Sequence, residues 1–286
     1  MATLKDLKSR IKSTEGISQV TSAMKIVAAN KFAKAKKNLD SCKAYNLEMD
    51  KTIRTVSALS EKYTHAYLEK NSSKKEILLI VSSNKGLCGS YNSSLARTVT
   101  SFLNNAKEPV EIYFIGKKVK EIIKSPSSNM YSFKGSEPSF LEIKDIALEL
   151  GQLFLDKKIS RINIAFNVFK TAMFFIPTIK QILPFTLSDW EIEHLKQETT
   201  CDFLYNPSVE EILDELIPQV YINMFYGCIL DSLASEHGIR MTVMTLASNN
   251  CTEAIRLLTL KANKLRQAAI TTELIEVISG AEFMNS

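Results

Sequence analysis

The sequence predicts an α/β fold: long helices at the two chain ends pair as an antiparallel coiled coil, and a Rossmann-like α/β domain is inserted between them. Three observations lead to this prediction. No proline follows Pro218, so about 60 residues are free to form one helix. No proline precedes Pro109, and Gly16 is the only glycine among the first 85 residues. Between these stretches, short apolar runs alternate with segments of helical spacing, which is typical of a parallel sheet.

Residues 208–286 contain an apolar seam with the repeat of a coiled coil. Alternating steps of four and three residues give it a mean repeat near 3.5 residues. Its positions are Leu230, Ala234, His237, Met241, Met244, Ser248, Cys251, Ile255, Leu258, Ala262, Leu265 and Ala269. About 60 helical residues make a rod of roughly 90 Å. Such a rod cannot bury the seam on itself, so it requires a second long helix.

Residues 1–70 supply that helix in this prediction, with about 55 to 65 residues in helical conformation. The phase of the apolar positions slips near Gly16, which predicts a kink or a stutter there. The apolar positions are Leu4, Leu7 and Ile11, followed by Ile17, Val20, Met24 and Val27. We expect Met24 and Val27, like Met241 and Met244, to pack inside the coiled coil.

The first helix is also rich in lysine, with Lys25, Lys31, Lys34, Lys36, Lys37 and Lys43. Two interpretations stay open: a solvated helix face, or an electrostatic track that faces an acidic partner surface. Nucleic acid is a weaker candidate, because few aromatic side chains interleave for base stacking and no nucleic-acid-binding motif occurs.

Residues 71–207 form the inserted domain, in which strands and helices alternate. We expect strands at Glu76–Ser82, Val110–Ile115, Arg161–Phe169 and Thr178–Leu183, and a further one at Cys201–Tyr205. Helices are expected at Tyr91–Asn105, Lys117–Lys124 and Leu141–Asp156. The stretch Ser125–Pro138, rich in serine and proline, is expected to be a loop.

The turn after the first strand contains Gly86 and Gly89 and invites a nucleotide-binding interpretation. Their GxxG spacing matches neither GxGxxG nor GxxxxGK[ST], and no acidic residue is suitably placed after the second strand. A tight turn that seats the next helix, with Cys88 buried or facing a neighbour, explains the pattern better. A nucleophilic cysteine needs a base, and no motif places a histidine beside Cys88. We therefore expect neither a catalytic residue nor a cofactor.

Composition excludes several further classes of protein. The chain has 286 residues, a formal charge of +5 and 45% hydrophobic residues, so it is mildly basic and able to form a core. Its five scattered cysteines contain no CxxC pair, which predicts free thiols and no metal site. The N-terminus lacks an apolar signal core, and no apolar run approaches the length of a membrane span. Any membrane association is expected to go through a partner.

Three stretches together resemble the gamma subunit of F-type ATP synthases, and the resemblance covers nearly the whole chain. The first is Ile11–Ser13 with Val20–Ala28, the second is Ser83–Asn92, and the third combines Ala234–Glu236, Arg240–Met241, Asn263–Leu274 and Ser279–Ala281. The resemblance implies a non-catalytic rotating shaft that couples proton flow to ATP synthesis.

The implied partners are three alpha and three beta subunits, the epsilon and delta subunits, and the membrane ring of c subunits. Two sets of contacts with the beta subunits are implied: Met24 and Lys25, and Arg266, Gln267 and Thr271. Gly86, Cys88 and Gly89 match the turn of the foot domain.

Asn84 stands where the family usually has Asp, and Lys85 where Arg is common. A charge contact of that Asp is therefore not expected here. Without a transit peptide or a cysteine-bearing insertion, the sequence favours a bacterial form on the cytoplasmic side of the inner membrane. The competing interpretation is a stand-alone coiled-coil scaffold or nucleic-acid-binding protein, and a nucleotide enzyme that uses the Gly86–Gly89 turn is a third.

Overall fold

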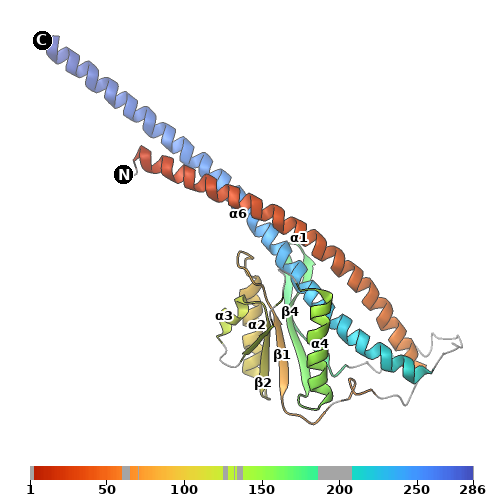
Figure 1. The fold of residues 1–286 in the computed structure, drawn as a ribbon. Coiled ribbons are helices and arrows are strands. Elements are labelled where there is room, and N and C mark those ends of the chain that lie inside the picture. Colours follow the sequence, from red (N-terminus) through yellow and green to blue (C-terminus); the bar gives the residue numbers. More distant parts are fainter. Residues whose placement is uncertain are drawn as a thin grey trace. The chain divides into compact units, whose positions relative to one another are not determined.

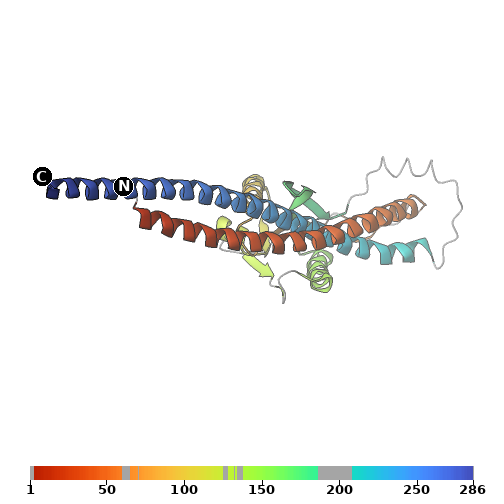
Figure 2. The same ribbon diagram turned by 90° about the horizontal axis from the view of Figure 1, so that it is seen from above.

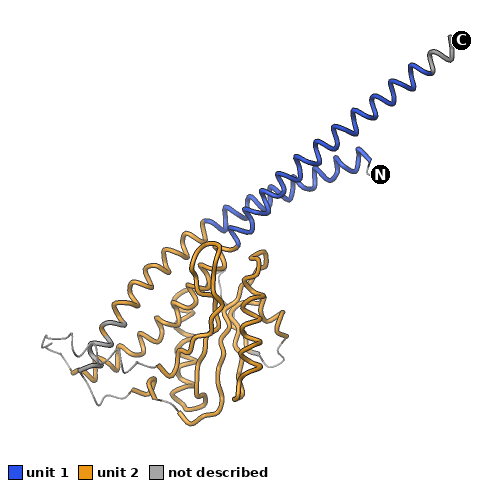
Figure 3. Tube along the Cα trace, turned by 180° about the vertical axis from the view of Figure 1, so that it is seen from behind, with its two compact units in different colours: residues 1–29, 240–286 blue, residues 30–239 orange. Residues whose placement is uncertain are grey.

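The computed structural model describes residues 3–59, 65–69, 71–124, 128–131, 133, 138–185 and 208–285. Two long helices, α1 (Leu4–Leu59) and α6 (Val209–Asn285), lie at the ends of the chain, and a five-stranded sheet with its own helices lies between them in sequence (Figure 1). The predicted fold class is confirmed. The chain divides into two compact units: unit 1 is residues 1–29 and 240–286, and unit 2 is residues 30–239 (Figure 3). Domain boundaries at residues 70 and 207 stay a prediction.

The sheet in unit 2 has the strand order β3-β2-β1-β4-β5. Its strands are β1 (Glu76–Val81), β2 (Val110–Ile115), β3 (Ser128–Tyr131), β4 (Arg161–Thr171) and β5 (Phe174–Leu183). The central strand β1 pairs in parallel with β2 and β4, while β5 runs antiparallel to β4. All six residues of β1 are buried, as an unbroken apolar run in a parallel sheet requires.

Helices cover both faces of this sheet. Side chains of β1 alternate: Ile77 and Leu79 belong to one core, and Leu78 and Ile80 to the other, because successive residues of a strand point to opposite faces. The first core is closed by α4 (Phe140–Leu155) and α6, and the second by α2 (Tyr91–Asn105) and α3 (Lys118–Ile123).

Two predictions about the edge strands of the sheet need correction, and β4 extends two residues beyond its predicted end at Phe169. The expected loop Ser125–Pro138 contains the edge strand β3, which pairs with β2. Two of its four residues, Ser128 and Asn129, are polar, so it lacks the apolar run of a buried strand. Strand β5 begins at Phe174 rather than Thr178, and it includes Pro177. Proline is tolerated there because β5 is an edge strand with one unpaired side. The expected strand at residues 201–205 lies outside the described residues.

Helices α1 and α6 lie side by side and antiparallel within each unit (Figures 1 and 2). In unit 2, Lys43 of α1 forms an ion pair with Asp231 of α6 (Nζ–Oδ1 3.0 Å), and the Asn46 amide donates to the carbonyl of Asn223 at 3.5 Å. In unit 1, the Ser22 and Ser248 hydroxyls are 3.0 Å apart. The predicted helix pairing is therefore correct.

The seam of α1 follows a different line from the predicted one. Helix α1 continues through Gly16 without a break, and Met24 and Val27 are 41% and 56% exposed. The buried and half-buried positions instead run through Leu4, Leu7, Ile11, Thr14, Ser18, Thr21 and Ala28. The expectation that Met24 and Val27 pack inside the coiled coil was wrong, because the line set by Leu4 to Ile11 continues through polar residues.

The seam of α6 in unit 1 is confirmed from Met244 to Ala262, where each predicted position is buried or half-buried. Beyond Ala262 every residue through Ile278 is exposed, including the predicted seam positions Leu265 and Ala269. Since Ser22 pairs with Ser248, an antiparallel α1 reaches its first turn opposite about residue 266. Helix α6 thus continues past the end of its partner (Figure 3).

Candidate functional site

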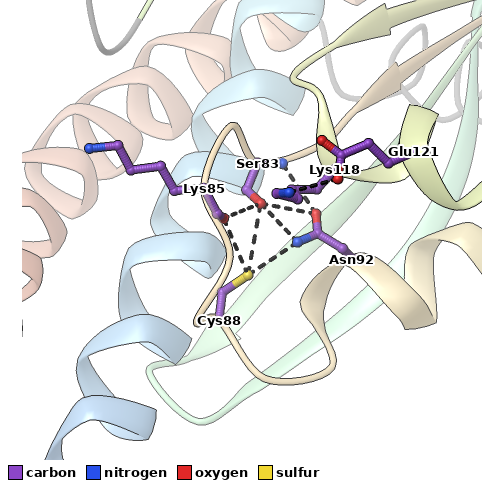
Figure 4. A network of polar contacts seen from close by, with 6 residues as sticks. All are labelled: Ser83, Lys85, Cys88, Asn92, Lys118 and Glu121. Atoms are coloured by element: carbon purple, nitrogen blue, oxygen red, sulfur yellow. Dashed lines mark hydrogen bonds and ion pairs between the residues drawn. The ribbon is translucent and has the colours of Figure 1, made fainter. Parts of the chain in front are cut away.

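The turn after β1 is held by a compact hydrogen-bond network around Ser83 (Figure 4). The Ser83 hydroxyl donates to the carbonyl of Lys85 at 2.8 Å, and the Asn92 amide donates to Ser83 Oγ at 2.8 Å and to Cys88 Sγ at 3.2 Å. The Ser83 backbone N–H donates to Asn92 Oδ1 at 3.2 Å. The network joins the end of β1 to the first turn of α2, so the predicted structural role of this turn is supported.

Backbone geometry explains why Gly89 belongs to this turn. Gly89 has a φ of +56°, in the left-handed region that side chains disfavour. Leu87 is also left-handed, with a φ of +62°, and 60% of its side chain is exposed. A Cβ added at Gly86 would have no atom of another described residue within 4 Å, apart from those of its chain neighbours. The left-handed backbone therefore favours glycine at position 89, whereas Gly86 is not required for space.

Cys88 is buried and accepts a hydrogen bond from Asn92. The described free cysteines also include Cys228, which is buried, and Cys42 and Cys251, which are half-buried. Burial raises the pKa of the Cys228 thiol to about 12, and it raises the pKa of Cys42 as well. Because the thiolate is the reactive form, these surroundings make structural cysteines rather than nucleophiles.

This burial leads to a labelling prediction. In the purified native chain, a maleimide at about pH 8 should modify Cys251 before the other three described cysteines and should leave Cys88 and Cys228 unmodified. Mass spectrometry of digested protein measures the order. The same reaction in denaturant is the control, in which all of these thiols should react. Rapid native labelling of Cys228 would contradict its burial.

A sheet of this topology has a site where ligands commonly bind, but α6 occupies it here. In open α/β sheets, ligands bind beyond the carboxyl ends of the strands where the strand order reverses, which in this sheet is between β1 and β4. The Ser232 hydroxyl of α6 donates to the carbonyl of Val81, the last residue of β1 (3.3 Å). The Ser235 hydroxyl donates to the carbonyl of Asn167 in β4 (3.1 Å). Helix α6 of the same chain therefore lies at the edge where ligands bind in other open α/β sheets.

The polar groups at this edge are deeply buried. Tyr91 at the start of α2 is 1% exposed, and its hydroxyl lies 2.6 Å from Ser232 Oγ. Burial raises the pKa of Tyr91 well above its usual value, so this hydroxyl stays a neutral donor. The Asn167 amide donates to the carbonyl of Tyr91 at 3.3 Å. These contacts tie α6 to the sheet, although the side-chain oxygen of Asn167 is buried without a hydrogen-bond partner in the part of the chain that the structure describes.

The residues expected to contact beta subunits lie on the exposed surface of unit 1, in two separate places. Met24 and Lys25 are exposed on α1, and Arg266, Gln267 and Thr271 are exposed on α6. The pairing of Ser22 with Ser248 places Met24 opposite about residue 246. From there to Arg266 is about 20 residues, or roughly 30 Å along the helix. The structure does not bring the two sets together, so each would meet a different partner surface.

Sequence reasoning missed the buried polar residues that anchor α6. The resemblance included Tyr91 and Ser235 in its matching stretches but assigned them no role, and Ser232 and Asn167 drew no attention. A signal was present, since Ser232 and Ser235 are spaced to share a helix face. Their partners, however, come from distant parts of the chain.

These features define a class of protein in which two long helices pair and one of them covers the carboxyl edge of the sheet of an α/β domain. Among the described residues, no group of three or more metal-ligating side chains is placed to hold an ion. None of the described helices is long and apolar enough to cross a membrane.

Comparisons with known proteins agree with this class. A family model described as ATP synthase matches residues 3–284. The chain is 34% identical to the ATP synthase gamma chain of Trichlorobacter lovleyi, with 99% of each chain covered, and 36% identical to that of Christiangramia forsetii over the full length of both. The chain belongs to the ATP synthase gamma chain family, whose members are the non-catalytic central shaft of that enzyme.

Solved structures share the fold. The central stalk and c-ring structure of the Tetrahymena thermophila mitochondrial ATP synthase contains a similar chain, with a TM-score of 0.58, 24% identity and coverage of 80% of this chain and 99% of that one. A chain of the Euglena gracilis mitochondrial enzyme has a TM-score of 0.63 at 15% identity, covering 98% and 94%. Family membership decides against the stand-alone scaffold and the nucleotide enzyme.

Proposed function

We propose that the chain turns inside a ring of three alpha and three beta subunits and carries rotation from a proton-driven ring of c subunits to the catalytic sites of the beta subunits. The α/β domain of unit 2 would serve as the foot, held with the epsilon and delta subunits. The exposed end of α6 would lie inside the ring. The matching structures of central stalk and c-ring assemblies support this arrangement of partners.

The observation that carries the proposal is the exposed, apolar end of α6. Five large apolar side chains beyond Ala262 are between 49% and 70% exposed: Ile270, Leu274, Ile275, Val277 and Ile278. The spacing of Ile270, Leu274 and Val277 places them on one helix face. An apolar surface of this kind marks an interaction site, because water does not stabilise it. A surrounding sleeve of subunits would cover it.

Two further surfaces fit contacts with the beta subunits. Arg266 presents a planar guanidinium that can donate two parallel hydrogen bonds to a carboxylate, a geometry that lysine does not reproduce. Met24 lies on α1 in an exposed apolar stripe with Ile17 and Val20, next to the exposed Lys25. An acidic partner loop with apolar flanks would match this second surface. The two surfaces would act at different heights of the ring.

We further propose that the chain works at the cytoplasmic side of a bacterial inner membrane and is held there by its partners. The full-length relatives from Trichlorobacter lovleyi and Christiangramia forsetii support this placement. Purification of the chain with one copy per three alpha and three beta subunits is the expected result. A chain that never associates with these subunits would contradict the proposal.

Replacement of Arg266 or Gln267 by alanine should impair coupling far more than folding. Both residues are exposed, so we expect the unfolding free energy of the chain to change by less than about 0.5 kcal/mol. Loss of a charge-assisted hydrogen bond to a beta subunit should lower coupled ATP synthesis by about ten-fold for Arg266→Ala. ATP synthesis in reconstituted vesicles and urea unfolding measure the two effects.

Lys264→Ala is the matched control, because Lys264 is also exposed and cationic but lies two residues away, on a different side of the helix. It should retain most of the coupled activity. Equal losses of assembly and activity in Arg266→Ala would place Arg266 in packing rather than in coupling.

A further inference from the structure

A short segment of α6 is fastened to the carboxyl edge of the sheet by directional bonds from three side chains. Ser232 donates to the carbonyl of Val81 (3.3 Å). The Tyr91 hydroxyl donates to the backbone carbonyl of Ser232 at 3.1 Å, and it lies within hydrogen-bond distance, 2.6 Å, of Ser232 Oγ. Hydrogen bonds of Ser232 therefore connect α6 to both α2 and β1.

Two more bonds connect the same segment to β4. Ser235 donates to the carbonyl of Asn167 at 3.1 Å, and the backbone N–H of Phe169 donates to Asp231 Oδ1 at 3.3 Å. Asp231 also pairs with Lys43 of α1. The bonds therefore link α6 to α2, β1 and β4, and Asp231 extends the link to α1. All of these residues lie within unit 2.

Because these hydrogen bonds are buried, they resist rotation of α6 about its axis. Ser232 and Asn167 are 0% exposed, and Tyr91 and Ser235 are 1% exposed. Close packing of the core also resists the turning of α6 about its axis, but the apolar attraction itself is non-directional. Hydrogen bonds weaken steeply when their angle changes, and without competing water a buried bond cannot be exchanged for another. Hydrogen bonds to several elements therefore fix the position of α6 along its axis and its angle about that axis, both relative to the sheet.

We propose that Tyr91, Asn167, Ser232 and Ser235 form a torsional lock, a set of positioning residues that fixes the angle of α6 about its axis relative to the sheet. Rotation imposed on the α/β domain passes into α6 through this lock. The inference rests on the proposed rotary function and adds the residues that bear the torque. The torsional lock lies at the carboxyl edge of the sheet, where ligands bind in other open α/β sheets. In this chain, that edge joins the sheet to α6.

The test uses the assembled ATP synthase with its alpha and beta subunits immobilised and a probe attached to the α/β domain. The double variant Ser232→Ala, Ser235→Ala removes the three contacts of the serine hydroxyls, and it leaves the bond to Asp231 and the bond from Tyr91 to the backbone carbonyl of Ser232. We expect the angular variance of the stalled probe to rise about two-fold, because parallel bonds share the load and packing keeps part of the stiffness. Proton pumping per ATP hydrolysed in vesicles should fall, while ATP hydrolysis is retained.

The control is the double variant Ser93→Ala, Ser94→Ala in α2. These hydroxyls bond only to carbonyls of their own helix turn, at Ser90 and Tyr91, so the variance should not change. If the first double variant fails to assemble, Tyr91→Phe decides: it removes the hydroxyl that contacts the Ser232 carbonyl and Ser232 Oγ, keeps the ring, and should raise the variance by a smaller amount.

A purely structural role would lower the melting temperature and the yield of complexes without changing the variance of those that assemble. Unchanged variance in assembled Tyr91→Phe and serine variants would overturn the lock. Failure of the unmodified chain to rotate in the complex would instead contradict the proposed function, so the two failures are distinguishable.

Discussion

Replacement of Gly116 by alanine should destabilise the chain by about 3 kcal/mol or more. Gly116 ends β2 with a φ of +92°, and a Cβ there would lie 2.1 Å from the carbonyl oxygen of Ser82. That carbonyl belongs to the backbone just beyond β1, where the Ser82 N–H donates to the carbonyl of Ile115 at 2.7 Å. The backbone cannot move aside without breaking this bond. Urea unfolding of the purified chain measures the loss.

Gly16→Ala is the matched control for this prediction. Gly16 lies in α1, and no atom of another part of the chain comes within 4 Å of the position that an added Cβ would take. Alanine should therefore stabilise the helix by about 0.5–1 kcal/mol. The two substitutions add the same methyl group with opposite expected signs. Equal effects, or a neutral Gly116→Ala, would show that the turn after β2 can relax.

Phe225→Ala should cost about 3–5 kcal/mol, because it empties the core between α6 and the sheet. The Phe225 side chain is 0% exposed, and it belongs to the core formed with α4 and one face of the sheet. Its ring also makes an edge contact with Tyr221, with ring centroids 6.2 Å apart. Since the stability of a domain is typically about 5–15 kcal/mol, this single change removes a large part of it.

Two variants separate cavity formation from other effects. Phe225→Leu keeps most of the volume and should cost about 1–2 kcal/mol. Phe174→Ala removes the same atoms from a ring that is 58% exposed at the start of β5, and its effect should stay within about 1 kcal/mol. Similar losses for Phe225→Ala and Phe174→Ala would contradict the assignment of Phe225 to the core.

Local patterns were enough to predict most of the α/β domain. Strand β2 and helix α2 have the predicted bounds, and β1 and α4 differ by a single residue at their ends. These elements were predictable because each buries one face, so apolar residues repeat along the sequence with a period of two residues in a strand or 3.6 in a helix. Strand β3 has only four residues at the edge of the sheet, and two of them are polar, so its pattern is too short to indicate a strand.

The candidate site was predictable only in part. The exposed residues Arg266, Gln267 and Thr271 came from the resemblance, and their exposure agrees with a surface role. The torsional lock could not be predicted, because Tyr91, Asn167 and Ser232 are widely separated in the sequence. A buried serine and an exposed serine look alike until the elements around them are placed.

By itself, the sequence determined that both chain ends are long helices, that a strand-rich domain lies between them, and that the chain resembles one family along its length. The tertiary structure decided which face of each helix is buried. Met24 and Val27 lie outside the seam and Thr14 lies within it, because the partner helix selects one line of contact among several that α1 offers. The structure also decided that α6 fills the ligand edge of the sheet, since hydrogen bonds between distant elements exist only after those elements have packed.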